Sequence, residues 1–229
     1  MPENFLFEKD GPVITITFNR PERRNFLNRE VLTQLEALIQ RVRDDRETRV
    51  LILTSTGPVF SAGAEMPSKE QSEEERRIGY ASRNKGMPRL IGRLFDQITR
   101  LDCMTIAAVN GHAIGGGWGL VLGFDFMISA ADAEFWLPEV ELGSAFTGGP
   151  ASVMAAVMGP WRAKEAIVLC RHFKARELFE LGMITKVVEP PELLPETHQL
   201  AQALLKKPAE AARASKHFID GVFVGARLY

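Results

Sequence analysis

Residues 105–120, with the sequence TIAAVNGHAIGGGWGL, indicate how the rest of the chain is organised. The run from Thr105 to Val109 combines β-branched and small residues and predicts a buried strand. A tight turn follows, and the triple glycine Gly115–Gly117 then precedes an apolar segment that predicts a helix. Glycines at the start of a helix permit positive φ angles and leave backbone N–H groups unpaired. Because this end of a helix carries partial positive charge, the stretch predicts a site for a negatively charged group.

The same order of strand, small-residue turn and helix recurs along the chain. Apolar or alternating runs predict further strands at 13–18, 50–54, 125–130 and 184–188, and a short extended piece at 133–139. Apolar residues at helical spacing predict helices at 31–43 (with Asn28 as N-cap), 90–101, 118–123, 151–158, 161–171, 175–181, 193–206 and 209–224. Residues 67–85 are rich in charge, which predicts a solvated loop. The alternation predicts an α/β fold with ligands outside the strand ends and a mostly helical second half.

Composition limits the class of protein. The chain has 229 residues, of which 45% are hydrophobic and 25% charged, and a formal net charge of −1. This balance is typical of a globular domain and excludes the broad basic surface that nucleic-acid binding needs. No apolar stretch approaches the roughly 20 residues that cross a bilayer, so we expect no membrane partner. Two cysteines and an N-terminus without a signal-peptide pattern predict a reducing, cytoplasmic location.

A second turn of small residues, Ser61–Ala64, also follows a strand-like run. Like the triple glycine, this turn offers an outward-facing backbone N–H group. Two convergent N–H groups form an oxyanion hole, which stabilises negative charge as it develops on a carbonyl oxygen. Either turn alone is equally consistent with close packing of a helix on a strand, but the pair favours the oxyanion hole.

Other kinds of site lack their characteristic spacing. No Lys followed by Ser or Thr completes a phosphate-binding loop, and the glycines after Gly115 do not match the dinucleotide-binding pattern. The four histidines lie far apart and match no metal-binding spacing, so we expect no metal. Ser144 does not lie in the G-x-S-x-G pattern of a nucleophilic serine.

A carboxyl group therefore remains as the candidate for proton transfer. Glu139 follows the apolar run 136–138, a setting that raises a carboxyl pKa and suits general acid–base work. Glu141 lies two residues later, and in an extended segment both side chains point to the same side. We prefer Glu139 as the functional residue because its neighbours are more apolar.

Five stretches, in order along the chain, resemble the crotonase superfamily, which is the enoyl-CoA hydratase/isomerase family. They are 16–28 (ITFNRPERRNFLN), 60–65 (FSAGAE), 106–117 (IAAVNGHAIGGG), 135–143 (FWLPEVELG) and 175–184 (ARELFELGMI). Each is weak alone, but five in order over nearly the whole chain are a specific signal. The resemblance implies a crotonase-like spiral of ββα repeats at 1–190 with an acyl-CoA site, and C-terminal helices at 191–229 that are short for the family. It also implies a homotrimer or a hexamer.

The resemblance also implies roles for single residues. The backbone N–H groups of Ala64 and Gly116 would hold the oxygen of a coenzyme A thioester as it becomes an enolate, and Glu139 would transfer the proton. Coenzyme A is then part of the substrate, and no separate cofactor is expected. The residues implied in substrate binding, with Arg24 near a phosphate, are Arg24, Phe26, Ala62, Gly63, Gly115, Gly117, Trp118, Gly119 and Pro138.

One departure from the family pattern bears on the reaction. Hydratases with two carboxylates carry a second glutamate two residues after the triple glycine, where this chain has Gly119. A lone glutamate at position 139 resembles enoyl-CoA isomerases, in which one base moves a proton between two carbons. It also resembles some hydratases and lyases with a single glutamate. We therefore expect isomerisation or hydration of an enoyl-CoA.

Two alternatives stay open. The segments 142–149 and 169–171 resemble a branch that forms or cleaves rings and acts on β-keto acyl-CoA thioesters. That branch has an acidic residue where this chain has Thr147, and none at the position of Glu139. Gly119 would leave room for the bulky or cyclic acyl group of such a substrate. The other alternative is a protein that binds acyl-CoA without turnover, which Gly119 and the short C-terminus suggest.

Overall fold

The computed structural model describes residues 4–65 and 86–225, so the loop predicted at 67–85 lies outside the described residues. A six-stranded sheet has the order β1-β2-β3-β5-β7-β10, and a four-stranded sheet has the order β4-β6-β8-β9. The strands of the larger sheet are β1 (Phe5–Asp10), β2 (Val13–Phe18), β3 (Val50–Ser55), β5 (Met104–Val109), β7 (Phe126–Ala130) and β10 (Lys186–Val188). Those of the smaller sheet are β4 (Val59–Ser61), β6 (His112–Ile114), β8 (Glu134–Trp136) and β9 (Phe173–Lys174).

Helices connect and cover the two sheets, which confirms the predicted α/β class. They are η1 (Pro21–Arg23), α1 (Arg29–Asp44), α3 (Met87–Thr99), α4 (Gly116–Val121), α5 (Gly149–Val168), α6 (Ala175–Glu180), η2 (Pro190–Glu192), α7 (Leu193–Leu205) and α8 (Ala209–Gly225). No described helix is both long and apolar enough to span a bilayer.

The chain runs through a repeated ββα unit. β3, β4 and α3 form one unit, β5, β6 and α4 form the next, and β7, β8 and α5 form the third. Each unit adds its first strand to the larger sheet and its second strand to the smaller sheet, in both cases parallel to the preceding unit. This is the predicted spiral of ββα repeats. Its consequence is that the segments following β4, β6 and β8 all leave the smaller sheet at the same end.

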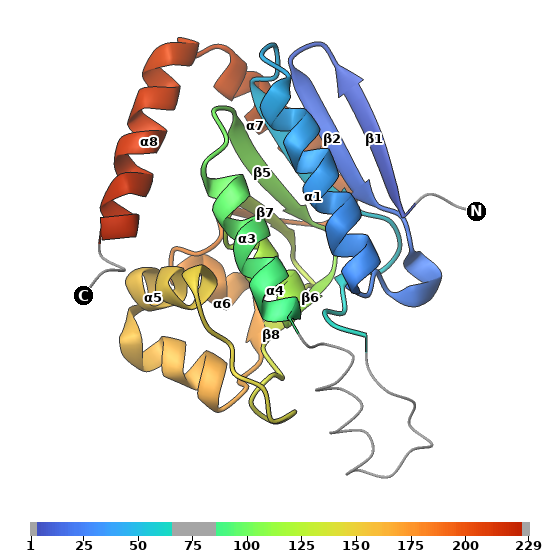
Figure 1. The fold of residues 1–229 in the computed structure, drawn as a ribbon, viewed down its shortest axis with the longest axis vertical. Coiled ribbons are helices and arrows are strands. Elements are labelled where there is room, and N and C mark those ends of the chain that lie inside the picture. Colours follow the sequence, from blue (N-terminus) through green and yellow to red (C-terminus); the bar gives the residue numbers. More distant parts are fainter. Residues whose placement is uncertain (1–3, 66–85, 226–229) are drawn as a thin grey trace.

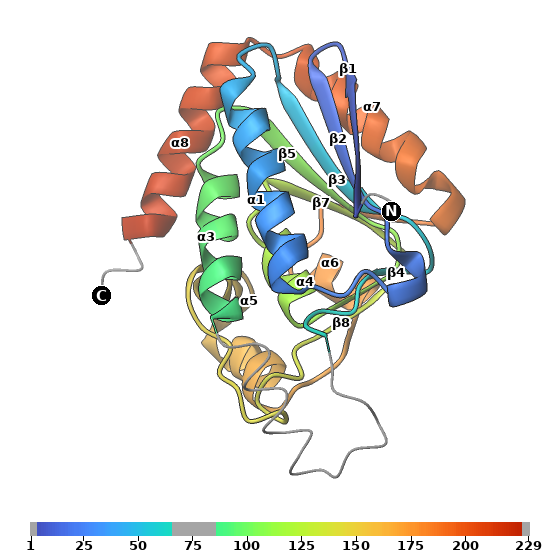
Figure 2. The same cartoon turned by 45° about the vertical axis from the view of Figure 1, so that its right-hand side comes forward.

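The two faces of the larger sheet are covered by different helices. α1 and α3 pack side by side on one face, and α7 lies on the other (Figures 1 and 2). Successive side chains of a strand point to opposite faces of the sheet, so alternate residues of β3 belong to the cores on its two faces. Leu51 and Leu53 belong to the main core, whereas Val50 and Ile52 pack with Leu193 and other residues of α7. The central strands are therefore buried on both faces, as expected for parallel strands.

Local sequence sets the helix boundaries. α1 begins after Asn28, whose side chain accepts a hydrogen bond from the backbone N–H of Val31 at 2.9 Å, so the predicted N-cap is confirmed. The two helices predicted at 151–158 and 161–171 are the two arms of α5, so the predicted break between them is confirmed. Gly159 has non-helical backbone angles (φ 80°, ψ 157°) and Pro160 follows it, and the second arm ends at Val168.

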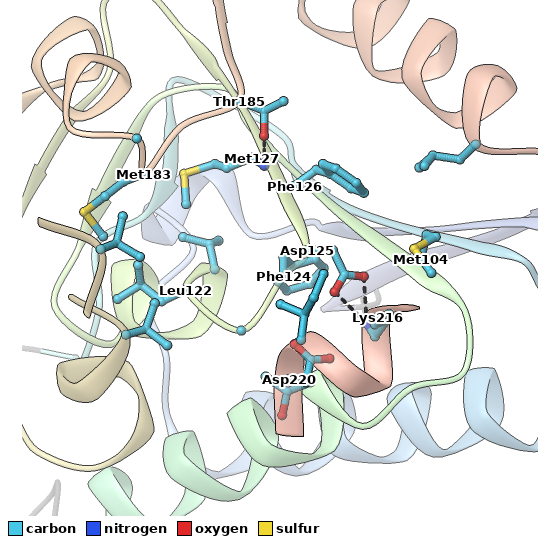
Figure 3. Close-up of a pocket in the computed structure, with 18 of the residues that line it drawn as sticks. Met104, Leu122, Phe124, Asp125, Phe126, Met127, Met183, Thr185, Lys216 and Asp220 are labelled. Atoms are coloured by element: carbon cyan, nitrogen blue, oxygen red, sulfur yellow. Dashed lines mark hydrogen bonds and ion pairs between the residues drawn. The ribbon is translucent and has the colours of Figure 1, made fainter. Parts of the chain in front are cut away.

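The last helix, α8, is attached to the larger sheet through a buried ion pair. The Nζ atom of Lys216 lies 2.7 Å from both carboxylate oxygens of Asp125, and the Lys216 side chain is only 4% exposed (Figure 3). Asp125 also accepts hydrogen bonds from the backbone N–H and the hydroxyl of Thr105, at 2.7 and 3.0 Å. Thr105 lies in β5, so the ion pair ties α8 to the strand that leads toward the triple glycine.

We predict that Asp125→Ala lowers the free energy of unfolding by about 3–5 kcal/mol, because it leaves the Lys216 ammonium buried without its counter-ion. Chemical denaturation followed by circular dichroism measures the change. Glu180→Ala, which removes an exposed partner of Arg176 on α6, is the control and leaves the denaturation midpoint unchanged. Equal effects of the two substitutions would contradict the structural role of the buried pair.

Candidate active site

Three segments with predicted functional residues leave the smaller sheet at one end. β4 pairs with β6 and β6 pairs with β8, all in parallel. The first turn (Ser61–Ala64) follows β4, the triple glycine follows β6, and the run to Glu139 follows β8. The carboxyl ends of parallel strands lie side by side, so these three segments become neighbours although they are far apart in sequence.

Close contacts show how tightly these segments meet. A Cβ atom built on Gly63 would lie 2.6 Å from the carbonyl oxygen of Ile114 and 3.5 Å from the backbone nitrogen of Gly116. A Cβ atom built on Gly115 would lie 2.7 Å from Oε1 of Glu139. Any larger residue at either glycine would separate the segments, and both glycines have positive φ angles, 73° and 53°.

Asn25, which the sequence analysis did not single out, holds the first turn in place. It is buried and has a φ of 49°, a conformation that asparagine adopts more readily than most residues. Its side-chain nitrogen donates to the carbonyls of Thr56 and Val59 at 3.0 and 2.9 Å. Its side-chain oxygen accepts from the N–H of Arg20 at 2.9 Å, and its backbone carbonyl accepts from the Ser61 hydroxyl at 2.9 Å. This network fixes the start of the turn.

The backbone N–H groups of Ala64 and Gly116 remain available to a ligand. Ala64 forms a parallel bridge with Leu27, whose N–H donates to Gly63 at 2.7 Å and whose carbonyl accepts from Glu65 at 3.2 Å. This pairing uses the residues on either side of Ala64, so its own N–H points away from Leu27. Gly116 is the first residue of α4 and has no acceptor for its N–H within that helix. Neither N–H group has an acceptor among the described residues.

Glu139 lies against the triple glycine with its carboxyl group largely removed from water. Its Oε2 atom is buried and has no hydrogen-bond partner within the described part of the chain. Burial raises the pKa of this carboxyl from 4.5 to about 7, because the charged form is the one that loses hydration. A carboxyl group with such a pKa accepts and returns a proton readily at neutral pH.

The expectation that Glu139 and Glu141 share an extended segment is wrong. Residues 139–143 form a turn, in which the N–H groups of Leu142 and Ser144 donate to the Glu139 carbonyl at 3.1 and 2.8 Å. Glu141 is exposed, whereas Glu139 is half-buried. The two carboxyl groups therefore have different environments, and that of Glu139 is the one suited to proton transfer.

Gly119 is covered by an aromatic ring. A Cβ atom at this position would lie 3.2 Å from Cε2 and Cζ of Phe146 and 3.8 Å from Cγ2 of Ile91. The room for a bulky acyl group that the sequence suggested at Gly119 is thus filled, and that expectation is corrected. Neither Phe146 nor Ile91 was predicted as a site residue, because each is distant from Gly119 in sequence.

Two other predicted substrate-binding positions lie within the packing of the site. A Cβ atom built on Gly117 would lie 2.7 Å from the Cβ of Ser61, so this glycine allows α4 to approach the first turn. Trp118 is fully buried and packs against Phe135 and Phe173, with ring centroids 5.7 and 6.1 Å apart. Its indole belongs to the hydrophobic core, and a contact with substrate stays a prediction.

The remaining predicted residues lie beside the first turn. The carbonyl of Arg24 accepts a hydrogen bond from the N–H of Ala62 at 3.0 Å, and the Arg24 side chain is exposed. Phe26 is half-buried next to Leu27, and Pro138 is half-buried next to Glu139. Their part in binding a substrate stays a prediction.

A pocket of about 520 Å³ lies away from this cluster (Figure 3). Most of its lining is apolar and comes from the segment between α4 and β7, from α5 and from α8, and the Asp125–Lys216 ion pair forms part of its wall. It shares no lining residue with the cluster of Ala64, Gly116 and Glu139. We place the candidate active site by its chemistry, at that cluster.

Comparison with known proteins agrees with this geometry. The model of the enoyl-CoA hydratase/isomerase family matches residues 8–222. The chain belongs to this family. Membership confirms the resemblance seen in the sequence and the predicted class, an acyl-CoA-processing enzyme of the hydratase/isomerase type.

Individual members of the enoyl-CoA hydratase/isomerase family cover most of the chain. Crotonyl-CoA hydratase of Syntrophomonas wolfei is 34% identical over 217 residues, which are 93% of this chain and 80% of that protein. The crystal structure of an enoyl-CoA hydratase from Bacillus anthracis is 29% identical and has a TM-score of 0.82, covering 95% of this chain and 83% of that one. A monofunctional enoyl-CoA isomerase from M. smegmatis is 26% identical with a TM-score of 0.77, covering 96% and 93%.

We predict that Gly115→Ala lowers kcat about 10²-fold, because the added Cβ displaces the Glu139 carboxyl, and misplacing a reacting group by about 1 Å costs this much. The assay uses the enoyl-CoA that the wild-type enzyme turns over fastest. Gly11→Ala is the control, since Gly11 has a φ of 54° and no atom within 4 Å of an added Cβ. Both substitutions strain the backbone, but only the first lowers kcat. An unchanged kcat in Gly115→Ala would argue against the placement of Glu139.

Proposed function

We propose that this chain is an enzyme that shifts the double bond of an enoyl-CoA, or adds water to it, through an enolate intermediate with Glu139 as the acid–base residue. The observation that carries the proposal is a carboxyl group with a buried, unpartnered oxygen, held against Gly115 beside the open N–H group of Gly116. Both reactions occur among the proteins that the chain is similar to, which include a hydratase and an isomerase.

In the proposed reaction the thioester oxygen lies between the N–H groups of Ala64 and Gly116. In the double-bond shift, removal of a proton from carbon 2 gives the enolate; in hydration, addition of the water oxygen to carbon 3, with loss of a proton from that water, gives it. In both, the two N–H groups stabilise the negative charge of the enolate. One donor of this kind typically contributes about 10²–10³ to the rate. The Leu27 bridge and the start of α4 hold the donors in position before substrate binds, so little reorganisation opposes the reaction.

In the proposed mechanism, Glu139 is the group that accepts and donates the proton. In the double-bond shift, its carboxylate takes a proton from carbon 2 of a 3-enoyl thioester and returns it to carbon 4, so the double bond moves to carbons 2 and 3. In hydration, water adds its hydroxyl to carbon 3 and a proton is added to carbon 2, and one carboxyl must assist both steps. The double-bond shift needs only one carboxyl group. Because position 119 holds a glycine in place of a second glutamate, Glu139 is the one carboxyl group that we propose for this site.

The proposal includes a coenzyme A thioester as the substrate and no separate cofactor. The exposed cation of Arg24 beside Ala62 supports a contact with a phosphate of coenzyme A. A homotrimer or a hexamer is also part of the proposal, and a cytoplasmic location stays a prediction from the sequence. Exposed apolar side chains on and next to α5 and α8 support an oligomer, namely Trp161, Val168, Leu169, Phe218 and Ile219.

We predict that Glu139→Gln lowers kcat/KM by about 10³-fold, because an amide neither accepts nor returns the proton. A panel of 2-enoyl-, 3-enoyl- and β-keto acyl-CoA thioesters is assayed for double-bond shift, water addition and cleavage. The wild-type kcat/KM rises with pH as the carboxyl ionises, reaches half its limiting value at about pH 7 and levels above about pH 8. Full turnover by the variant would remove Glu139 from the mechanism. Turnover of β-keto thioesters alone favours the ring-forming branch, and binding without turnover favours a non-catalytic protein.

The same substitution tests the burial of the carboxyl group independently of activity. Since folding raises the pKa of Glu139, ionisation destabilises the folded state as the pH rises from about 4.5 through about 7. We predict that Glu139→Gln increases the free energy of unfolding by about 2–3 kcal/mol at about pH 8, and changes it little below about pH 4.5. Denaturant titrations at both pH values measure this, and a variant less stable than wild type at the higher pH contradicts the assigned environment.

A further inference from the structure

Phe146 lies against the position to which a second carboxylate side chain would be attached, Gly119. The described atoms nearest to a Cβ built on Gly119 are Cε2 and Cζ of Phe146, both at 3.2 Å, and Cγ2 of Ile91 at 3.8 Å. At 3.2 Å the contact is tighter than most Cβ contacts, so the ring would have to shift by a few tenths of an ångström before a side chain fits at position 119. The Phe146 ring therefore competes with any side chain at position 119 for the space beside α4.

Ile91 of α3 extends this apolar surface toward Gly116. Its Cδ1 atom would lie 2.5 Å from a Cβ built on Gly116, and its Cγ2 approaches Gly119. Gly116 and Gly119 are three residues apart on α4 and so lie on one face of that helix. Phe146 and Ile91 are both partly buried and pack against the main core. Together they cover the face of α4 next to the proposed enolate site.

The loop that carries Phe146 also carries Glu139. The N–H group of Ser144 donates to the Glu139 carbonyl at 2.8 Å, and that of Leu142 donates to it at 3.1 Å. These hydrogen bonds fix the turn between the acid–base residue and the ring, so the positions of both are set by one short segment.

The described side chains next to Gly119 offer no hydrogen-bond partner to a water molecule. An ordered water molecule needs roughly two to four polar partners, and the side chains of Phe146 and Ile91 supply none. Hydration needs a water held at carbon 3 of the acyl chain and a base that takes its proton. The double-bond shift needs neither, because the proton that leaves carbon 2 is the one that arrives at carbon 4.

We propose that Phe146 determines the choice of reaction: by competing for the space beside Gly119 that a second carboxylate and its water would need, it commits the site to moving a proton within the acyl chain. The inference rests on the proposed function, in which Glu139 acts on an enolate. In the shift, a carbon 2–hydrogen bond breaks and a carbon 4–hydrogen bond forms. In hydration, one water supplies the oxygen bound to carbon 3 and a proton balances carbon 2, and the double bond is lost.

The test is the ratio of hydration to double-bond shift, measured by chromatography of the products from 2-enoyl-CoA and 3-enoyl-CoA. We expect Phe146→Ala to raise this ratio about tenfold, because it admits water. We expect Gly119→Glu combined with Phe146→Ala to raise it by a further factor of about 10², because a carboxylate then acts as base on that water. Phe146→Leu keeps most of the apolar volume of the ring, and Phe179→Ala removes a ring from α6, away from the site. These two controls leave the ratio unchanged.

A wild-type ratio in both Phe146→Ala and the double variant, with each folded and active through Glu139, would overturn the inference and leave the proposed function intact. A wild-type protein that converts neither enoyl-CoA overturns the proposed function, and the inference with it. If Phe146→Ala does not fold, Phe146→Val carries the test, and its ratio must exceed that of Phe146→Leu. Equal ratios in those two variants would also overturn the inference.

Discussion

The parallel pairing of β4, β6 and β8 is the constraint on which the site depends. Each strand has only three residues, and each directs one side chain into the main core, namely Phe60, Ala113 and Phe135, all fully buried. This packing holds short strands that hydrogen bonds alone would hold weakly. Because the strands are fixed, the turns that follow them are fixed as well, and two N–H groups and one carboxyl converge.

The cluster of Ala64, Gly116 and Glu139 contains an unfavourable interaction, and the hydrogen bonds of the surrounding segments offset its effect on stability. A buried carboxyl oxygen without a partner destabilises the fold, whereas the φ of 53° at Gly115 costs little because glycine has no Cβ. Around them, the hydrogen bonds of Asn25 and the bridge between Leu27 and Ala64 satisfy the neighbouring backbone. The supporting backbone is not regular, since Arg24 and Asn25 both have a φ of 49°, but its polar groups are hydrogen-bonded. The unsatisfied group is thus the carboxyl that would meet a substrate, and the segments around it hold it in place.

The sequence predicted elements with a clear hydrophobic period well and the others poorly. β1 is as long as β2 but was not predicted, because its side chains are mostly exposed and FLFEKD shows no alternation of apolar and polar residues. α1 and β2 were predicted nearly to the residue, since periodicity and the Asn28 cap are local signals. Strands such as β9, with two residues, are too short for a period to be seen. The glycine turns and Glu139 stood out by residue type. The covering of Gly119 by Phe146 did not, because that contact depends on how a loop folds back on α4.

The central claim is that one carboxyl group carries the proton within a dry site, and following the hydrogen itself tests it most directly. A 3-enoyl-CoA is converted in deuterium oxide, and mass spectrometry and NMR locate the hydrogen in the product. A single shielded carboxyl predicts that part of the hydrogen removed from carbon 2 is found at carbon 4, because a buried acid returns its proton before it exchanges with solvent. A product with only deuterium added at carbon 4 would contradict the account.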